Sequence, residues 1–199
     1  TGGITFSLEN LTLEGVADSL QPIFRVSAKA FMRKLPELAE IIGELLNETK
    51  FDDKKRILEL LQQNRSEFEL EMLQSPVQVA LARLNSFISK AGAYNEQGEL
   101  SSYPLLKNLT DEFDANADDF CGKLAQVMSL LFSTKRLTIG VTIEESNYAA
   151  FADGMKPLLL KLQENTEADR AEAVAYNFQP APQQEGLLSS SQVQYVAKG

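Results

Sequence analysis

A helical repeat of apolar residues runs from Leu35 to Ile88 with few breaks, and it leaves few folds open to this chain of 199 residues. Between Leu35 and Leu46 the apolar residues recur at intervals of three and four, which is the spacing of one helix face. A second stripe follows from Asp53 to Gln74, where Lys55–Glu59 and Arg65–Glu69 are spaced to pair on the outer face. Pro76 then restarts the chain, as the first turn of a helix tolerates proline. We expect amphipathic helices that share one core.

Strand-like patterns flank this helical run. Ile4, Phe6 and Leu8 alternate with polar residues, which is the period of a half-buried strand. An antiparallel neighbour is expected from Ile23 to Phe31. Further strands are expected at 137–143, 173–178 and 193–197, further helices at 104–113, 120–132 and 148–162, and loops at 92–103 and 179–192.

Strands and helices occur in groups rather than in alternation, which indicates an α+β fold with an antiparallel or mixed sheet layered against several long helices. One such domain is expected over residues 1–190, with residues 191–199 beginning a link to a following domain. The strand-like ends and the missing initiator Met predict that the chain is cut from a longer polypeptide, with the domain truncated at its N-terminal edge. The edge at Ile4 to Leu8 is then expected to pair with a second copy.

The acidic charge excludes two classes of partner. A formal net charge of -9 disfavours binding to nucleic acid or to an anionic membrane through a basic face. No apolar stretch approaches the roughly 18 residues of a membrane span, and no signal peptide is recognisable. Cys121 is the single cysteine, and its place on the apolar side of a helical pattern predicts a buried structural thiol. These features predict a reducing, cytoplasmic compartment.

The absence of histidine restricts the chemistry of the chain. Zinc sites are built mainly from His and Cys, and carboxylates with one Cys make a poor dedicated site. Hydrolases that use His as a base are excluded on the same ground, and no Ser-x-x-Lys spacing replaces it. Gly122-Lys123 lacks the upstream glycine of a phosphate-binding loop. The sequence therefore predicts no catalytic, metal-binding or cofactor-binding residue in this chain.

Acidic clusters are the remaining candidates, and each has a structural explanation. Asp114, Asn116 and Asp118 resemble the start of a calcium loop, but Asp119 and Ala125 stand where that loop needs glycine and glutamate. Pairs of carboxylates can hydrolyse glycosides, but the pairs here suit helix starts or a solvated helix face. These pairs are Glu144-Glu145, Asp118-Asp119 and Glu67 with Glu71. We expect neither a calcium site nor a carboxylate hydrolase.

Several segments, taken in order, resemble the C-terminal half of the presequence-protease branch of the pitrilysin/insulinase zinc metallopeptidases. They extend over nearly the whole chain, and their shared order carries the resemblance. The segments are T-G-G-I at 1–4, F-R-V-S-A-K-A-F at 24–31, the stretch from Leu35 through Asn47 to Phe51-Asp52-Asp53, A-R-L at 82–84, Y-N-E-Q-G at 94–98, Glu185-Gly186 and V-Q-Y-V-A-K-G at 193–199. The chain departs from the family pattern at Ser75-Pro76-Val77-Gln78 and at Glu99.

The resemblance implies a chamber of two halves that closes over unfolded peptide, with an inverted H-x-x-E-H zinc site in the N-terminal half. No residue here matches the zinc ligands or the glutamate base, and the substrate-contacting Arg and Tyr of the family fall beyond Gly199. The resemblance thus implies a non-catalytic, chamber-forming domain of a zinc metalloendopeptidase. Its partners would be the other domains of the same polypeptide and an extended peptide substrate.

Two other functions compete with this one. The long amphipathic run favours a free-standing helical adaptor or scaffold that binds a partner. A stand-alone hydrolase is the third possibility, and it requires activity of the isolated chain that survives chelation.

Overall fold

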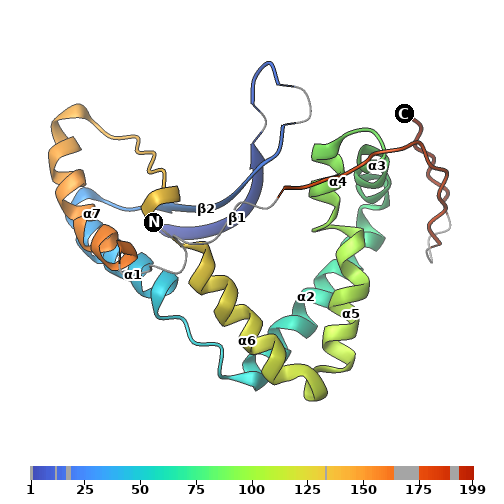
Figure 1. Ribbon diagram of the computed structural model, residues 1–199, viewed down its shortest axis with the longest axis horizontal. Helices are drawn as coiled ribbons and strands as arrows, with labels where there is room; N and C mark the ends of the chain where they lie inside the picture. The colour runs from blue at the N-terminus through green and yellow to red at the C-terminus, as the bar shows by residue number, and fades with distance from the viewer. Residues whose placement is uncertain (1, 12, 17–18, 133, 164–174, 189–192) are drawn as a thin grey trace. The chain divides into compact units, whose positions relative to one another are not determined.

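Residues 2–11, 13–16, 19–132, 134–163, 175–188 and 193–199 are described by a computed structural model, shown in Figure 1. Two strands come first and helices follow. The strands are β1 (Gly3–Leu11) and β2 (Gln21–Lys29). The α-helices are α1 (Leu35–Asn47), α2 (Lys54–Gln74), α3 (Pro76–Ser86), α4 (Lys90–Glu96), α5 (Tyr103–Asp111), α6 (Phe113–Leu131) and α7 (Tyr148–Gln163). Short 3₁₀ turns are η1 (Met32–Lys34), η2 (Leu100–Ser102), η3 (Thr134–Arg136) and η4 (Glu145–Asn147). The predicted α+β class is confirmed.

The chain divides into two compact units. The first unit comprises Thr1–Phe6, Val26–Lys54 and Ala117–Val174, and the second comprises Ser7–Arg25, Lys55–Asn116 and Ala175–Gly199. The strands and α6 contribute residues to both units. The single domain expected over residues 1–190, and the link expected from 191, stay predictions.

The two strands form an antiparallel hairpin (Figure 1). Its turn contains Gly15 with a φ of 75°, a backbone conformation that favours glycine. The predicted strands are confirmed, but the apolar side of β1 is not covered, because Phe6 and Leu8 are 47% and 76% exposed. Within the described residues no strand pairs with the other edge of β1.

The core of the first unit is the contact between α1 and α7, which run side by side in Figure 1. Buried residues of α1 recur at helical spacing, as the sequence predicts, and meet a matching set on α7. They are Leu35, Ala39, Ile42 and Leu46 on α1, with Met155, Leu158 and Leu162 on α7. The stripe on α1 is narrower than predicted, because Ile41 and Leu45 remain exposed.

The second unit is built on α2 to α5. Pro76 and Pro104 stand in the first turns of α3 and α5, where the missing N–H has no helical partner to lose. The predicted Arg65–Glu69 pair of α2 is confirmed at 2.9 Å, whereas Glu59 pairs with Arg56 at 3.2 Å in place of the predicted Lys55.

Four predicted segments differ from the structure. The loop expected over 92–103 contains the end of α4 and η2. The strand expected over 137–143 is irregular, and its apolar residues Leu137, Ile139 and Val141 stay exposed. Residues 175–178 and 193–197 are irregular rather than strands, while 173 and 174 lie outside the described residues. Alternation alone does not make a strand, since a strand also needs a partner to bond with.

Candidate functional site

The acidic candidates from the sequence lie apart from one another in ordinary structural contacts. Asp114 and Asn116 lie in the first turns of α6, where Asp118 pairs with Lys54 at 2.7 Å. Asp119 pairs with Lys123 at 2.6 Å. Glu67 of α2 accepts a hydrogen bond from Gln63 at 2.9 Å, and Glu145 opens η4 directly after Glu144. None of these pairs combines into a larger acidic site among the described residues.

The donor set of the chain does not fit zinc. Histidine is absent from the sequence, and the described residues contain no group of three Cys, Asp or Glu side chains placed to hold an ion. The expectation of no metal-binding and no catalytic residue stays a prediction. No helix of the described part is long and apolar enough to cross a membrane.

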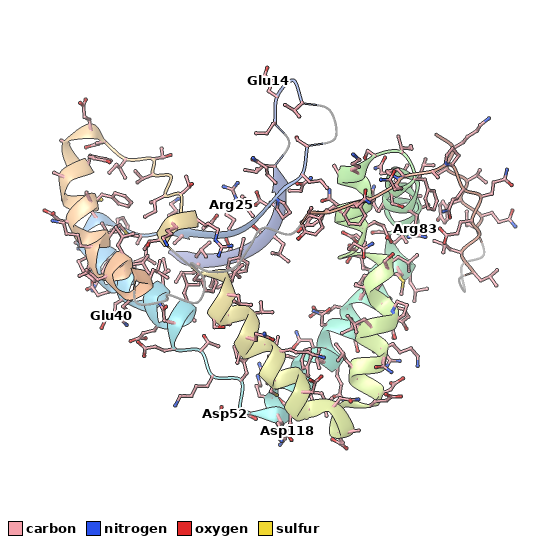
Figure 2. The ribbon with its side chains drawn as sticks, viewed as in Figure 1. Glu14, Arg25, Glu40, Asp52, Arg83 and Asp118 are labelled. Atoms are coloured by element: carbon pink, nitrogen blue, oxygen red, sulfur yellow. The ribbon has the colours of Figure 1, made fainter. Side chains whose placement is uncertain are left out.

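Cys121 is buried on α6, as the sequence predicts. It lines an open depression of about 470 Å³ in the first unit, together with Lys54, Asp118 and the segment from Thr49 to Asp52. Asp52 and Asp118 lie near each other at this position in Figure 2.

Arg83 of α3 joins three polar groups that are far apart in the sequence (Figure 2). Its Nη1 lies 2.8 Å from Glu96 Oε2 and donates to Ser101 Oγ at 3.2 Å. Its Nε and Nη2 donate to the two carboxylate oxygens of Glu185 at 2.8 and 3.0 Å. The guanidinium carbon also lies 5.1 Å from the centre of the Phe87 ring. One side chain therefore connects α3, the end of α4, η2 and the C-terminal segment.

Glu96 is the buried member of this cluster, with 2% of its side chain exposed. It accepts hydrogen bonds from the Ser101 backbone N–H at 3.1 Å and from the Ser101 hydroxyl. A buried carboxylate is tolerated when a cation and hydrogen bonds replace its lost water, and both are present here. Glu185 is 34% exposed. The hydrogen bonds from Arg83 lower the pKa of Glu185 and, in return, raise the pKa of Arg83.

The helices α3 and α4 approach closely at Gly92. A Cβ at this position would lie less than 3.0 Å from the carbonyl oxygen of Asn85, so only glycine fits. Ser89 caps α4 by accepting a hydrogen bond from the Gly92 N–H at 3.0 Å. This tight connection places Tyr94 and Glu96 beside Arg83.

An aromatic cluster lies at the same helix pair. The Tyr94 ring meets Tyr176 and Phe178 edge to face, at centroid distances of 5.2 and 6.3 Å. Tyr176 and Phe178 stack on each other at 6.0 Å. Burial, followed by the neighbouring Tyr176, raises the pKa of Tyr94.

A second ionic cluster joins α2 to α5. Arg65 of α2 donates to Glu69 at 2.9 Å and to Asp111 of α5 at 2.6 Å. The Tyr103 hydroxyl donates to Glu69 at 2.7 Å, and the Tyr103 ring stacks on Phe68 at a centroid distance of 5.6 Å. Arg65 and then Tyr103 lower the pKa of Glu69, and the two carboxylates raise the pKa of Arg65.

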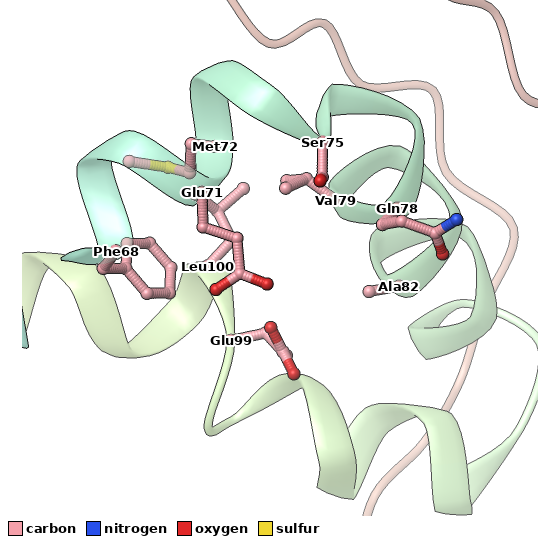
Figure 3. A pocket seen from close by; sticks show the side chains of 9 residues that line it. All are labelled: Phe68, Glu71, Met72, Ser75, Gln78, Val79, Ala82, Glu99 and Leu100. Carbon is pink, nitrogen blue, oxygen red and sulfur yellow. The ribbon is translucent and has the colours of Figure 1, made fainter.

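The second unit also contains a pocket of about 330 Å³ between α2, α3 and η2 (Figure 3). Its apolar wall includes Phe68, Met72 and Val79, and the carboxylates of Glu71 and Glu99 point into its opening. Ser75, Gln78 and Glu99, where the chain departs from the family pattern, all line this pocket.

The sequence reasoning assigned no role to Arg83 or Glu96. The signal was nevertheless present, because A-R-L at 82–84, Y-N-E-Q-G at 94–98 and Glu185-Gly186 are three of the segments that carried the family resemblance. The structure brings these three segments together at one cluster.

These clusters can orient and hold chain segments, but among the described residues they do not place a nucleophile beside a base. The fold and the clusters thus define an α+β scaffold of helices locked by ion pairs. The model of the family described as associated with peptidases of metallopeptidase family 16, subfamily C, matches residues 1–109 of the 199. The chain belongs to this peptidase-associated family, and the predicted resemblance to the C-terminal region of insulinase-type peptidases is confirmed.

Two curated relatives align with the whole chain. "Protein HypA" of Clostridium perfringens is 30% identical over 200 residues, which cover 100% of this chain and 20% of that protein. "Presequence protease 1, chloroplastic/mitochondrial" of Arabidopsis thaliana is 23% identical over 199 residues, which cover 100% of this chain and 18% of that protein. The chain thus spans about a fifth of the length of these relatives.

Proposed function

We propose that this chain works as a non-catalytic, chamber-forming region of a longer zinc metalloendopeptidase that degrades unfolded peptides. The family match carries the proposal, and the lack of any imidazole supports placing the zinc and its chemistry elsewhere in the polypeptide. The partners of the region are then the other domains of the same polypeptide and an extended peptide substrate. One cysteine, which is buried, is the basis for placing the protein in the cytoplasm.

A chamber needs a second rigid wall that excludes water and holds extended peptide near the catalytic half. Helices locked to each other by Arg65 and Arg83 suit such a wall, because they keep their shape under the load of a bound chain. The acidic charge of -9 suits contact with cationic rather than anionic peptides.

The test compares the isolated chain with the full reading frame that encodes it. We expect the longer protein to cleave an unstructured peptide in a chelator-sensitive way and the isolated chain to cleave nothing. A full reading frame that encodes no zinc-binding motif would contradict the proposal. Capture of a separate folded partner by the isolated chain, with a native start codon near Thr1, would favour the adaptor instead.

A further inference from the structure

The C-terminal segment 175–188 runs across α3 and α4 as an irregular chain (Figure 1). Two anchors hold it. The aromatic anchor is Tyr176 and Phe178 on Tyr94, and the ionic anchor is Glu185 on Arg83. Pro180 and Pro182 lie between the anchors, and each fixes its own φ near the extended region. This stiffness lowers the entropy lost when the segment docks.

The receiving surface is organised by contacts that do not involve the segment. Arg83 is held from behind by buried Glu96 and by Ser101. Tyr94 belongs to α4, which Ser89 caps and Gly92 seats against α3. If the segment leaves, the guanidinium keeps its place and presents a planar fork that matches a carboxylate.

The contacts of the segment are few and partly open to water. Glu185 is 34% exposed and Tyr176 is 44% exposed, and Leu188 contacts almost nothing. Segments with few buried contacts open at low free energy while the rest of the fold stays closed.

We propose that α3 and α4 form a docking face for an extended segment that carries two aromatic residues and an acid seven residues later. Residues 175–188 occupy this face as a strap that opens and closes as one piece. The inference is independent of the proposed function. The occupant is fixed by chemistry: an aromatic-x-aromatic pair for Tyr94 and a carboxylate for the fork of Arg83.

The first experiment measures opening in the full 199-residue chain. Chymotrypsin cleaves after aromatic residues, and under native conditions its rate at Tyr176 and Phe178 follows the open population of the strap. We expect E185Q to raise this rate about three- to tenfold, because it weakens a bidentate ion pair seven residues away. The exposed Phe31 serves as an internal reference, followed by mass spectrometry, and should be cleaved at an unchanged rate.

The matched control is E14Q, which removes the same charge from the exposed turn of the hairpin. It should leave cleavage at Tyr176 and Phe178 unchanged. Arg83 is not replaced, because its loss would leave buried Glu96 without its cation. The proposal is overturned if E185Q does not change the rate at Phe178, or if it speeds cleavage at Phe31 equally.

The second experiment tests the chemistry of the occupant. A synthetic peptide of residues 175–188 is titrated into the E185Q chain, and NMR shifts of α3 and α4 are followed. The peptide should bind more tightly than the same peptide with Glu185→Gln, by about three- to tenfold. The unaltered chain should bind the peptide more weakly than the E185Q chain, because its own strap competes at high effective concentration. Equal binding of the two peptides would overturn the assignment of the acid.

Discussion

Glu96 is an acidic residue that the fold keeps almost entirely out of water. Such a group is stable only while its partners remain, and here these are the Arg83 guanidinium and two donors from Ser101. Removing the carboxylate leaves the guanidinium of Arg83 short of one acceptor in a partly buried position. The cost of a buried polar group left without its partner exceeds the net value of the bond.

We therefore expect Glu96→Ala to lower the free energy of unfolding by about 1–3 kcal/mol in urea titrations. Glu71→Ala is the control, because Glu71 is an exposed acid of α2 in the same unit. It should change stability by less than about 0.5 kcal/mol. Equal effects of the two substitutions would show that the burial of Glu96 is not what matters.

The acids around Arg65 make a pH-dependent contribution to stability. Arg65 and then Tyr103 lower the pKa of Glu69, and Lys107 and then Arg65 lower the pKa of Asp111. A lowered pKa in the folded state stabilises the fold above the ordinary values of 4.5 and 3.8, and this stabilisation is lost as the pH falls through the lowered pKa. The contact between α2 and α5 should weaken in acid.

Carboxyl NMR titration checks this assignment. In R65Q we expect the pKa of Glu69 to rise toward its ordinary value, and that of Asp111 to rise less, because Lys107 remains. The pKa of Glu185 serves as the control, since its lowering depends on Arg83 and should persist. A Glu69 pKa that does not respond to R65Q would contradict the role of Arg65.

At the scale of the elements, helices were predictable where the apolar stripe was long. α1 and α2 begin within one residue of the expected positions, because their periodicity and Pro36 mark a start that needs no tertiary partner. α4 was missed, because its seven residues depend on the cap at Ser89 and on the seat at Gly92, and neither produces an apolar repeat. The strand expected at 137–143 was wrong, because no partner strand lies beside it in the described part of the chain.

The cluster at Arg83 could not be derived from residue patterns. Its members are separated by up to 102 positions, and no local rule relates them. The acidic pairs that the sequence did highlight sit on helix turns, as their spacing suggested, and pair with nearby lysines such as Lys123.

The approach of α3 to α4 gives a prediction at this scale. Gly92→Ala would place a methyl group less than 3.0 Å from the Asn85 carbonyl oxygen, so the helices must separate. We expect a loss of about 1–3 kcal/mol in unfolding free energy, as for other overpacked positions.

Gly122→Ala is the matched control for this substitution. Gly122 lies inside α6, and its added methyl group would meet nothing within 4 Å. Alanine should stabilise the helix there by about 0.5–1 kcal/mol. The opposite signs, measured by thermal or urea unfolding, separate a steric effect from a propensity effect.

At the scale of the whole molecule, the hairpin is the feature most open to other chains. β1 lacks a second neighbour among the described residues and exposes Phe6 and Leu8. We expect the isolated chain to associate through this edge as concentration rises, which light scattering would detect. Leu8→Lys should reduce this association, and a strict monomer at high concentration would contradict the edge-pairing prediction.

The prolines of the strap have a consequence for solubility. Pro180 and Pro182 carry no amide hydrogen, so an extended chain in this region cannot donate a regular ladder of bonds to a second molecule. Opening of the strap therefore exposes aromatic rings without creating a template for cross-β stacking. The chain can release its terminal segment repeatedly with little risk of seeding fibrils there.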